Sequence, residues 1–350
     1  MTTLTTGNGP RVLKNSGLDA DRVPFDSLPV IDLAPIFGAD LDAKAKLAAD
    51  LRRACTEVGF FYIKNHGVPQ TVIDGAFDTA ARYFAQPDEA KMDIHVAKSR
   101  NNRGYAAMLE ENTDPTARGD LHESWDMALE VPADDPDVLA GKVLYGPNQW
   151  PVGDAAFKDS VEAYYAEMIK LSHNLLHAFA LSLELEERHF DAMVDKPLAT
   201  LRLLHYPPQF GEIDEKQIGI GAHSDYECFT ILAQGGGIEA LQVLNSDGDW
   251  VAAPPLPGHF VVNVGDQMAR WTNDLFASTV HRAINRSGNE RYSIPFFFGP
   301  NYDAMIEPLE SCVDAEHPAK YKPISSGDYV NGRFAETLAH YDPSKELPAE

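Results

Sequence analysis

The residue types that bind transition metals most readily form a sparse pattern in the second half of this chain. His223 and Asp225 stand two residues apart, and His281 follows after 55 further residues. In an extended strand, residues two apart point to the same face, so His223 and Asp225 can share a face while His281 approaches from another strand. Two imidazoles and one carboxylate on one face of an octahedron leave three adjacent positions open. That arrangement suits Fe(II) that must bind a chelating co-substrate and dioxygen side by side.

A second pattern, Arg291 and Ser293, begins ten residues after His281 in a strand-like run. Because the chain has 12 histidines, a histidine two residues before an aspartate can arise by chance. The Arg291–Ser293 pattern therefore supports the metal-site prediction. By alternation Arg291 and Ser293 share a face, and a guanidinium fork beside a hydroxyl fits a carboxylate. The alternative is an internal ion pair between Arg291 and one of the many acidic residues.

Tyr206 offers a weaker third element in the sequence LRLLHYPP. Arg202, Leu204 and Tyr206 alternate, so the Tyr206 hydroxyl can lie near the same carboxylate. The competing interpretation is ordinary packing, because a tyrosine in a β-rich run is more often part of a core than a ligand.

The overall composition narrows the classes of partner. The chain has 350 residues, 44% of them hydrophobic, which is enough for a large core in one or two domains. Its formal net charge of −24 should repel nucleic-acid phosphates and anionic lipid heads. It has no secretory apolar run at the N-terminus, no stretch as long as a membrane span, and three scattered cysteines (Cys55, Cys228 and Cys312). We therefore expect a cytoplasmic protein without disulfides, nucleic-acid partners or membrane partners.

The elements that must position these residues change in type along the chain. Residues 1–27 are mostly polar and predict a loose arm, whereas 28–33 and 60–67 are strand-like. Residues 95–153 are rich in Asn, Asp, Gly and Pro, which predicts long loops. Apolar residues at helical spacing predict helices at 41–58, 69–84 and 154–186, with shorter ones after Pro87 and at 326–340.

From residue 198 onward, short β-rich runs are separated by turn residues. The runs are TLRLLHY, QIGIGAH, FTILAQ, LQVLNSDGDWVAA, HFVVNVG, ASTVHRAI and RYSIPFFF, and NSDGD at 245–249 is a hairpin signal. This pattern predicts a sandwich or barrel rather than alternating βαβ units. We expect an α+β fold with a double-stranded β-helix (jelly-roll) core at 198–300. A helical N-terminal part at 28–197 and a C-terminal extension at 301–350 would complete a single domain.

These motifs, taken in order, resemble a known family. They are LPVIDLAP, GFFYIKNHGVP, YFAQPDEAK, RGY, LRLLHYPP, GIGAHSDYECFTIL, LQVLNSDGDWVAAPPLPGHFVVNVGDQMARWTN, HRAIN and RYSIPFFF. Over about residues 28–300 the chain resembles the isopenicillin N synthase-like branch of the iron(II)/2-oxoglutarate-dependent oxygenases. The resemblance implies an oxidoreductase that uses Fe(II), 2-oxoglutarate and O2. Such an enzyme releases succinate and CO2 while it oxidises a substrate C–H bond by hydroxylation, desaturation or cyclisation.

The resemblance also assigns roles to individual residues. His223, Asp225 and His281 match the iron ligands of the family. Arg291 and Ser293 match the pair that binds the distal carboxylate of 2-oxoglutarate, and Tyr206 matches an assisting tyrosine. One departure is Leu204, which stands where many plant members have an asparagine.

Substrate contacts are harder to assign. Five residues are candidates for the substrate pocket, and for each the alternative is ordinary packing or loop anchoring. Arg103 and Tyr105 belong to the RGY motif, Thr230 and Leu232 share the parity of the predicted metal ligands, and Phe297 shares the parity of the RxS pair. We expect Trp125 and Phe229 to belong to the core.

Three competing functions are open at this point. An isopenicillin N synthase-type oxidase would use iron and dioxygen without 2-oxoglutarate, and its Arg–Ser pair would bind the substrate's own carboxylate. A zinc hydrolase would need a general base near the metal, for which Glu227 is available. A non-catalytic metal-binding protein is the third. For the main interpretation we expect a small-molecule substrate and a monomer or weak homodimer.

Overall fold

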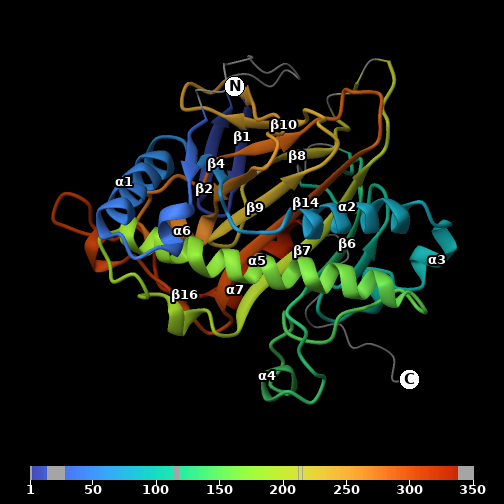
Figure 1. The fold of residues 1–350 in the computed structure, drawn as a ribbon, viewed down its shortest axis with the longest axis horizontal. Coiled ribbons are helices and arrows are strands. Elements are labelled where there is room, and N and C mark those ends of the chain that lie inside the picture. The colour runs from blue at the N-terminus through green and yellow to red at the C-terminus, as the bar shows by residue number, and fades with distance from the viewer. Residues whose placement is uncertain (1, 14–27, 114–117, 212, 215, 338–350) are drawn as a thin grey trace.

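A computed structural model describes residues 2–13, 28–113, 118–211, 213–214 and 216–337. Its centre is a pair of mainly antiparallel sheets that face each other as a jelly roll, with helices on the outside (Figure 1). The predicted α+β fold with a double-stranded β-helix core is confirmed. None of the described helices is long and apolar enough to cross a bilayer.

The larger sheet has eight strands, and half of them come from the N-terminal part of the chain. In spatial order they are β3 (Val30–Asp32), β4 (Phe60–Lys64), β12 (Phe260–Val264), β9 (Phe229–Gln234), β14 (Arg291–Asn301), β7 (Pro197–Tyr206), β6 (Glu123–Ala128) and β5 (Gly104–Ala106). Only the β3–β4 pair among them is parallel.

The smaller sheet carries both predicted metal-binding histidines. Its order is β11 (Trp250–Ala252), β10 (Leu241–Leu244), β13 (His281–Ala283) and β8 (Ile220–His223). Strands β10 and β11 form the hairpin predicted from the NSDGD turn. In the β13–β8 pair, His281 lies directly opposite His223.

Two predictions about the N-terminal part need correction. The loops predicted at 95–153 contain β5 and β6, and β6 is buried along its whole length. Its sequence, ESWDMA, carries charged residues that obscure the strand signal, and their partners come from remote segments: Lys91 contacts Glu123, and Arg202 contacts Asp126. The loose arm predicted at 1–27 is wrong over residues 2–13. There, β1 (Thr2–Thr6) and β2 (Gly9–Leu13) pair as a hairpin, and 14–27 lie outside the described residues.

The three predicted long helices are present as α1 (Leu41–Glu57), α2 (Gln70–Phe84) and α5 (Ala155–Ser182). The shorter helix predicted at 326–340 is α7 (Ser326–Thr337), and 338–340 lie outside the described residues. Asp154 begins α5, because its carboxylate accepts a hydrogen bond from the Phe157 N–H at 2.9 Å. The shorter elements are α3 (Asp88–Met92), α4 (Pro136–Leu139), α6 (Asp266–Trp271), β15 (Met305–Ile306), β16 (Ile324–Ser325) and 3-10 turns at Ala34–Phe37, Val96–Lys98, Asp191–Met193 and Glu310–Cys312.

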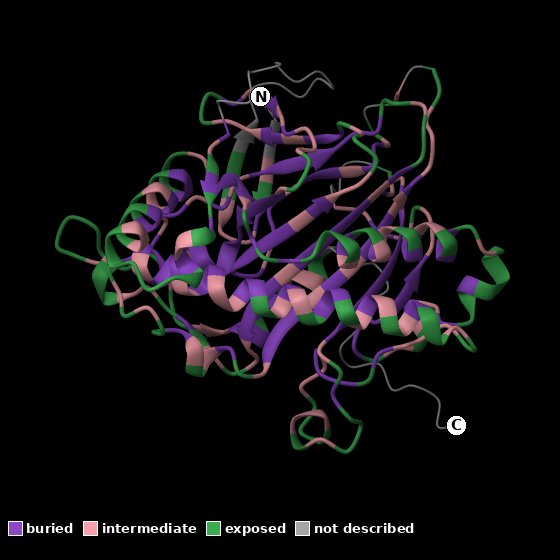
Figure 2. Ribbon diagram, in the orientation of Figure 1, coloured by how far each residue is buried: buried purple, intermediate pink, exposed green. Residues whose placement is uncertain are grey.

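Helix α5 covers the outer face of the larger sheet, with α1 and α2 packed beside it (Figure 1). Its aromatic residues meet those of the sheet: Phe179 stacks on Phe229 at 5.3 Å between ring centroids, and Tyr165 lies 5.4 Å from Phe296. Figure 2 shows the strands of the larger sheet as mostly buried, and these aromatic residues belong to one core cluster. Burying each such ring contributes about 2 kcal/mol, so this face is fixed firmly.

Side chains alternate between the two faces of β14, so those that do not pack under α5 face the site. Ile294, Phe296 and Phe298 belong to the core under α5, whereas Arg291, Ser293 and Phe297 line a cavity between the two sheets. Strand β9 divides in the same way, with Phe229 and Ile231 in the core, and Thr230 and Leu232 on the cavity. The core therefore sets which side chains reach the cavity.

Candidate metal centre

The three predicted metal ligands meet at one end of the cavity. His223 ends β8, His281 begins β13, and Asp225 lies two residues after β8, outside the strand. The Nε2 atoms of His223 and His281 lie 3.5 and 3.7 Å from Oδ1 of Asp225, and the ring centroids are 4.3 Å apart. One ligand atom from each residue lies within 4.8 Å of the other two, which is the spacing of a metal-binding cluster.

Hydrogen bonds from the backbone fix the orientation of both imidazoles. Nδ1 of His223 lies 2.9 Å from the carbonyl oxygen of Gly221, and Nδ1 of His281 lies 3.2 Å from that of Thr279. A carbonyl can only accept, so each Nδ1 carries the proton. Each Nε2 is therefore the ring nitrogen that faces Asp225, which is the orientation that a metal ion requires.

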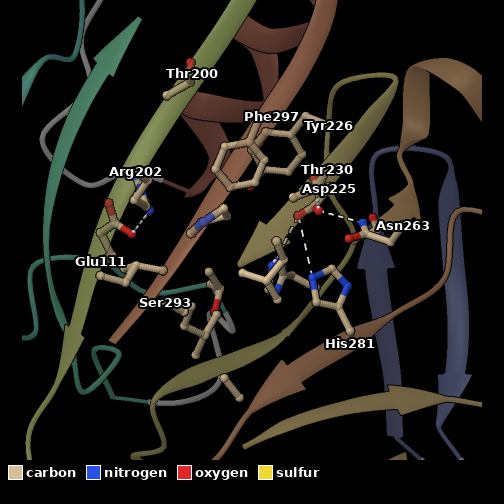
Figure 3. A pocket seen from close by; sticks show the side chains of 18 of the residues that line it. Glu111, Thr200, Arg202, Asp225, Tyr226, Thr230, Asn263, His281, Ser293 and Phe297 are labelled. Atoms are coloured by element: carbon tan, nitrogen blue, oxygen red, sulfur yellow. Dashed lines mark hydrogen bonds and ion pairs between the residues drawn. The ribbon is translucent and has the colours of Figure 1, made fainter. Parts of the chain in front are cut away.

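The Asp225 carboxylate is held by two side chains from neighbouring strands (Figure 3). Its Oδ2 accepts a hydrogen bond from Nδ2 of Asn263 at 2.7 Å and another from the hydroxyl of Thr230. Oδ1 is left facing the two imidazoles. Sequence reasoning missed Asn263 because only the pairing of β12 with β9 brings it close, and it placed Thr230 at the substrate instead.

The charges of the cluster favour a cation. Burial alone would raise the pKa of Asp225, but the nearby His281 and His223 outweigh it and hold that pKa below its ordinary value. Burial and the neighbouring His223 lower the pKa of His281 to about 4. An ionised carboxylate and a neutral imidazole are the forms that coordinate a divalent metal, so the donor set fits Fe(II).

Arg291 occupies the same cavity in an unusual state for a buried guanidinium. Its residue exposure is 2%, and within the described part of the chain it forms no ion pair with a carboxylate. Its contacts are long hydrogen bonds of 3.4 Å to Ser293 and Gln234, together with the ring of Tyr206 at 4.6 Å. The Ser293 hydroxyl lies 3.4 Å from that of Tyr206. A buried charge without a counter-charge is costly, so this cluster is suited to an anionic ligand.

The substrate-pocket candidates divide between the cavity and its surroundings. Arg103, Thr230, Leu232 and Phe297 line the cavity, which has a volume of about 130 Å³. The guanidinium of Arg103 is also committed to the scaffold, since it donates to the backbone carbonyls of residues 101, 102 and 144. The other lining residues include Glu111, Arg202, Tyr226 and Phe334, which sequence reasoning did not propose as substrate contacts.

Tyr105 is not at the cavity, which corrects its prediction as a substrate contact. It is 3% exposed, and its hydroxyl donates to Oε2 of Glu123 at 2.6 Å on the far side of β6. Lys91 binds the same oxygen at 2.6 Å. Trp125 and Phe229 are fully buried in the core, as expected.

Glu227, the candidate base of a zinc hydrolase, is buried and lines the same cavity as the ligand cluster. Burial and the charge of Asp225 raise the pKa of Glu227 to about 8.

Comparisons with known proteins agree with this geometry. The family model described as "non-haem dioxygenase in morphine synthesis N-terminal" matches residues 28–153, and the model of the 2OG-Fe(II) oxygenase superfamily matches residues 197–300. The second match includes the whole histidine–aspartate–histidine cluster and the Arg291 site. The chain belongs to the 2OG-Fe(II) oxygenase superfamily.

Individual relatives of this oxygenase extend over nearly its whole length. It is 40% identical to the 2-oxoglutarate-Fe(II) type oxidoreductase hxnY of Emericella nidulans over 92% of this chain and 93% of the relative. It is 34% identical to a homoarginine-6-hydroxylase of Glycine max over 88% of this chain and 96% of the relative. Among solved structures, a full-length Neurospora crassa protein in complex with alpha-KG and thymine is 31% identical, with a TM-score of 0.79 over 90% of this chain and 98% of that protein.

The chain is therefore a 2-oxoglutarate-dependent dioxygenase that uses Fe(II), 2-oxoglutarate and O2. It couples the conversion of 2-oxoglutarate into succinate and CO2 to the oxidation of a small-molecule C–H bond. Neither the isopenicillin N synthase-type oxidase nor the zinc hydrolase is favoured by these relatives.

Proposed function

We propose that His223, Asp225 and His281 bind the Fe(II) of this oxygenase, and that Arg291, Ser293 and Tyr206 bind the distal carboxylate of 2-oxoglutarate. The observation that carries the proposal is the guanidinium of Arg291, which has no carboxylate partner among the described residues and is buried in the same cavity as the ligand cluster. Because a carboxylate can accept bonds from the guanidinium and both hydroxyls, the co-substrate would neutralise this buried charge.

The contribution of the protein to the reaction is positioning and exclusion of water. When bound, the iron supplies the redox chemistry that links decarboxylation of 2-oxoglutarate to C–H oxidation. Asn263 and Thr230 hold the Asp225 carboxylate, and the Gly221 and Thr279 carbonyls hold the imidazoles, so the ligand atoms need little rearrangement. Arg291 lines the same cavity and would set the orientation of the co-substrate.

The substrate would enter the other half of the cavity and be a small molecule. Two relatives support a small molecule: Glycine max homoarginine-6-hydroxylase by its name, and the Neurospora crassa protein by its complex with thymine. Thr200, Arg202, Phe297 and Phe334 line the cavity, and Figure 3 shows the first three away from His281. Hydroxylation, desaturation and cyclisation would all use the same positioning groups.

Succinate formation tests the proposal directly. Fe(II)-loaded protein should convert 2-oxoglutarate into succinate slowly without substrate, and only with O2 present. Asp225→Ala should abolish both Fe(II) binding and succinate formation, while Asp191→Ala, which breaks an ion pair with His177 away from the cavity, should preserve both. Full turnover by the Asp225→Ala protein would refute the proposed ligand set. Turnover that never consumes 2-oxoglutarate would instead indicate the oxidase alternative.

We also propose that the enzyme acts in the cytoplasm as a monomer or weak homodimer, without nucleic-acid or membrane partners. Cys55 and Cys228 are buried, Cys312 is half-buried, and all three are free thiols, which suits a reducing compartment. The net charge of −24 disfavours polyanionic surfaces. Sedimentation at several protein concentrations would measure the oligomeric state.

A further inference from the structure

The substrate half of the cavity has one polar wall, formed by Arg202 and Glu111. Nη1 of Arg202 donates to Oε2 of Glu111 at 2.6 Å, while Nε and Nη2 donate to the two oxygens of Asp126 at 2.7 and 2.9 Å. The side chains of Glu111 and Asp126 are 5% and 2% exposed, and that of Arg202 is 16% exposed. Arg202 and Glu111 both line the cavity, whereas Asp126 lies behind them.

At this wall, N–H groups of Arg202 and one oxygen of Glu111 are not used by the hydrogen bonds just described. A guanidinium has five N–H groups, and the bonds to Glu111 and Asp126 use three of those of Arg202, so one N–H remains on each Nη atom. Oε2 of Glu111 also accepts from His122 at 3.2 Å, but Oε1 receives no hydrogen bond from any described residue. A ligand at this wall therefore meets a donor and an acceptor side by side.

The cations behind the wall already face carboxylates. His122 contacts the Gly219 carbonyl through Nδ1 and the Glu111 carboxylate through Nε2, and because both partners only accept, both ring nitrogens carry protons. The imidazolium and Arg202 face the carboxylates of Glu111 and Asp126, and the buried Asp120 also acts on His122. An anionic substrate group here would lack a free counter-charge.

Aromatic rings line the space between this wall and the metal cluster. Phe297 and Tyr226 both line the cavity, and Figure 3 shows their rings between Arg202 on one side and Asp225 on the other. The ring of Phe334, from α7, meets Tyr226 edge-on at 6.1 Å. Flat rings of this kind favour a planar ligand that stacks on them.

We propose that the substrate is an uncharged planar heterocycle with a cyclic amide edge, in which a ring N–H lies next to a ring carbonyl. The N–H would donate to Oε1 of Glu111, the carbonyl would accept from Arg202, and the ring would pack against Phe297 and Tyr226. This inference rests on the proposed function, because it places the substrate beside the same metal cluster. It makes Arg202 and Glu111 the specificity-determining residues of the enzyme.

The same wall discriminates against charged substrates. A carboxylate would compete with Glu111 and Asp126 for Arg202, and a guanidinium would be placed against Arg202 itself. The first case leaves a buried charge unpaired, and the second places two buried cations side by side. Homoarginine, the substrate named for the Glycine max relative, is cationic and should bind poorly here.

Binding to the holoenzyme tests the proposal. Calorimetry would be done under nitrogen with Fe(II) and 2-oxoglutarate bound, using uracil as the probe. 1,3-Dimethyluracil has the same ring and carbonyls but no N–H, so its affinity should be at least about tenfold lower. Homoarginine should show no binding at the concentrations that saturate with uracil. Uracil binding that is absent, or unchanged by methylation, would overturn the proposal.

A matched pair of variants tests whether Glu111 is the residue that binds uracil. Glu111→Gln removes the charged acceptor at the cavity and should weaken uracil binding at least about tenfold. Glu123→Gln changes an equally buried glutamate whose partners are Lys91, Tyr105 and His205, away from the cavity, and should leave the affinity for uracil unchanged. Equal affinity in the wild-type and Glu111→Gln proteins would contradict the assignment of Glu111.

Succinate formation separates this inference from the proposed function. Uracil should stimulate O2-dependent succinate formation by the wild-type enzyme. If basal succinate formation is intact and uracil has no effect on it, the substrate class is wrong and the metal and co-substrate sites stand. If basal succinate formation is itself absent, the proposed function fails.

Discussion

Asn263 donates a hydrogen bond of 2.7 Å to the oxygen of Asp225 that faces away from the two imidazoles. The two residues are 38 positions apart, and both side chains are buried. Asn263 thereby determines which carboxylate oxygen faces the metal position. It is a positioning residue for the metal site.

Replacing Asn263 should therefore weaken metal binding. In Asn263→Ala, Asp225 loses one of its two side-chain donors and can rotate, so the affinity for Fe(II) should fall about 10- to 100-fold. Titration with Fe(II) under nitrogen measures this affinity. Gln267→Ala, a buried amide bonded to Ser326, is the control and should bind Fe(II) as the wild type does. Wild-type affinity in Asn263→Ala would refute the positioning role.

Arg291→Gln should raise the KM for 2-oxoglutarate about 100-fold, because a charge-assisted contact to a carboxylate is lost from a buried site. Its effect on Fe(II) affinity should be small, since the hydrogen bonds of Arg291 go to Ser293 and Gln234 rather than to the three ligand residues. Steady-state kinetics at varied 2-oxoglutarate concentration gives the KM. Arg286→Gln, at an exposed position before β14, serves as the comparison. An unchanged KM would assign the co-substrate carboxylate elsewhere.

The buried His122 predicts a pH dependence of stability. Burial alone would lower the pKa of His122, but Glu111 and Asp120 outweigh it and raise that pKa above its ordinary value of 6.5. A raised pKa in the folded state adds stability that is fully present below pH 6.5 and is lost as the pH rises through the folded-state pKa. Urea unfolding from about pH 6 to about pH 9 should show the free energy of unfolding falling over this window.

The His122→Gln protein provides the control for that experiment. It lacks the titrating group, so the difference in unfolding free energy between the wild type and this variant should shrink as the pH rises. A difference that is constant with pH would mean that the pKa of His122 is not raised in the folded protein.

Tyr329 links the C-terminal helix to the metal-binding turn. Its hydroxyl donates to the buried carboxylate of Asp266 at 3.0 Å, and the Asp266 N–H donates to the carbonyl of Asp225 at 2.8 Å. Tyr329→Phe removes a donor from a buried carboxylate and should cost about 1.5–3 kcal/mol of unfolding free energy. Tyr321→Phe, whose hydroxyl bonds the half-buried Asp274, should cost less than about 1 kcal/mol. If urea unfolding shows equal losses of unfolding free energy in the two variants, the Tyr329–Asp266 hydrogen bond does not stabilise the protein as inferred.

The sequence alone determined the family, the jelly-roll core and the long helices. Period-two alternation determined that Arg291, Ser293 and Phe297 share a face, because successive residues in a strand point to opposite sides. The same rule holds for Thr230 and Leu232 in β9. These are local consequences of strand geometry, so they can be predicted from spacing.

Only the tertiary structure decided which remote groups complete the site. Asn263 reaches Asp225 through the pairing of β12 with β9, and Glu111 reaches Arg202 from a loop 91 residues earlier in the chain. Tyr105 has the same motif context as Arg103, yet it lies on the far side of β6, bonded to Glu123. Charged strands such as β6 hide their hydrophobic pattern because their ions are neutralised by partners that folding alone brings near. Register and long-range pairing depend on packing between segments distant in sequence, and no local pattern encodes that packing.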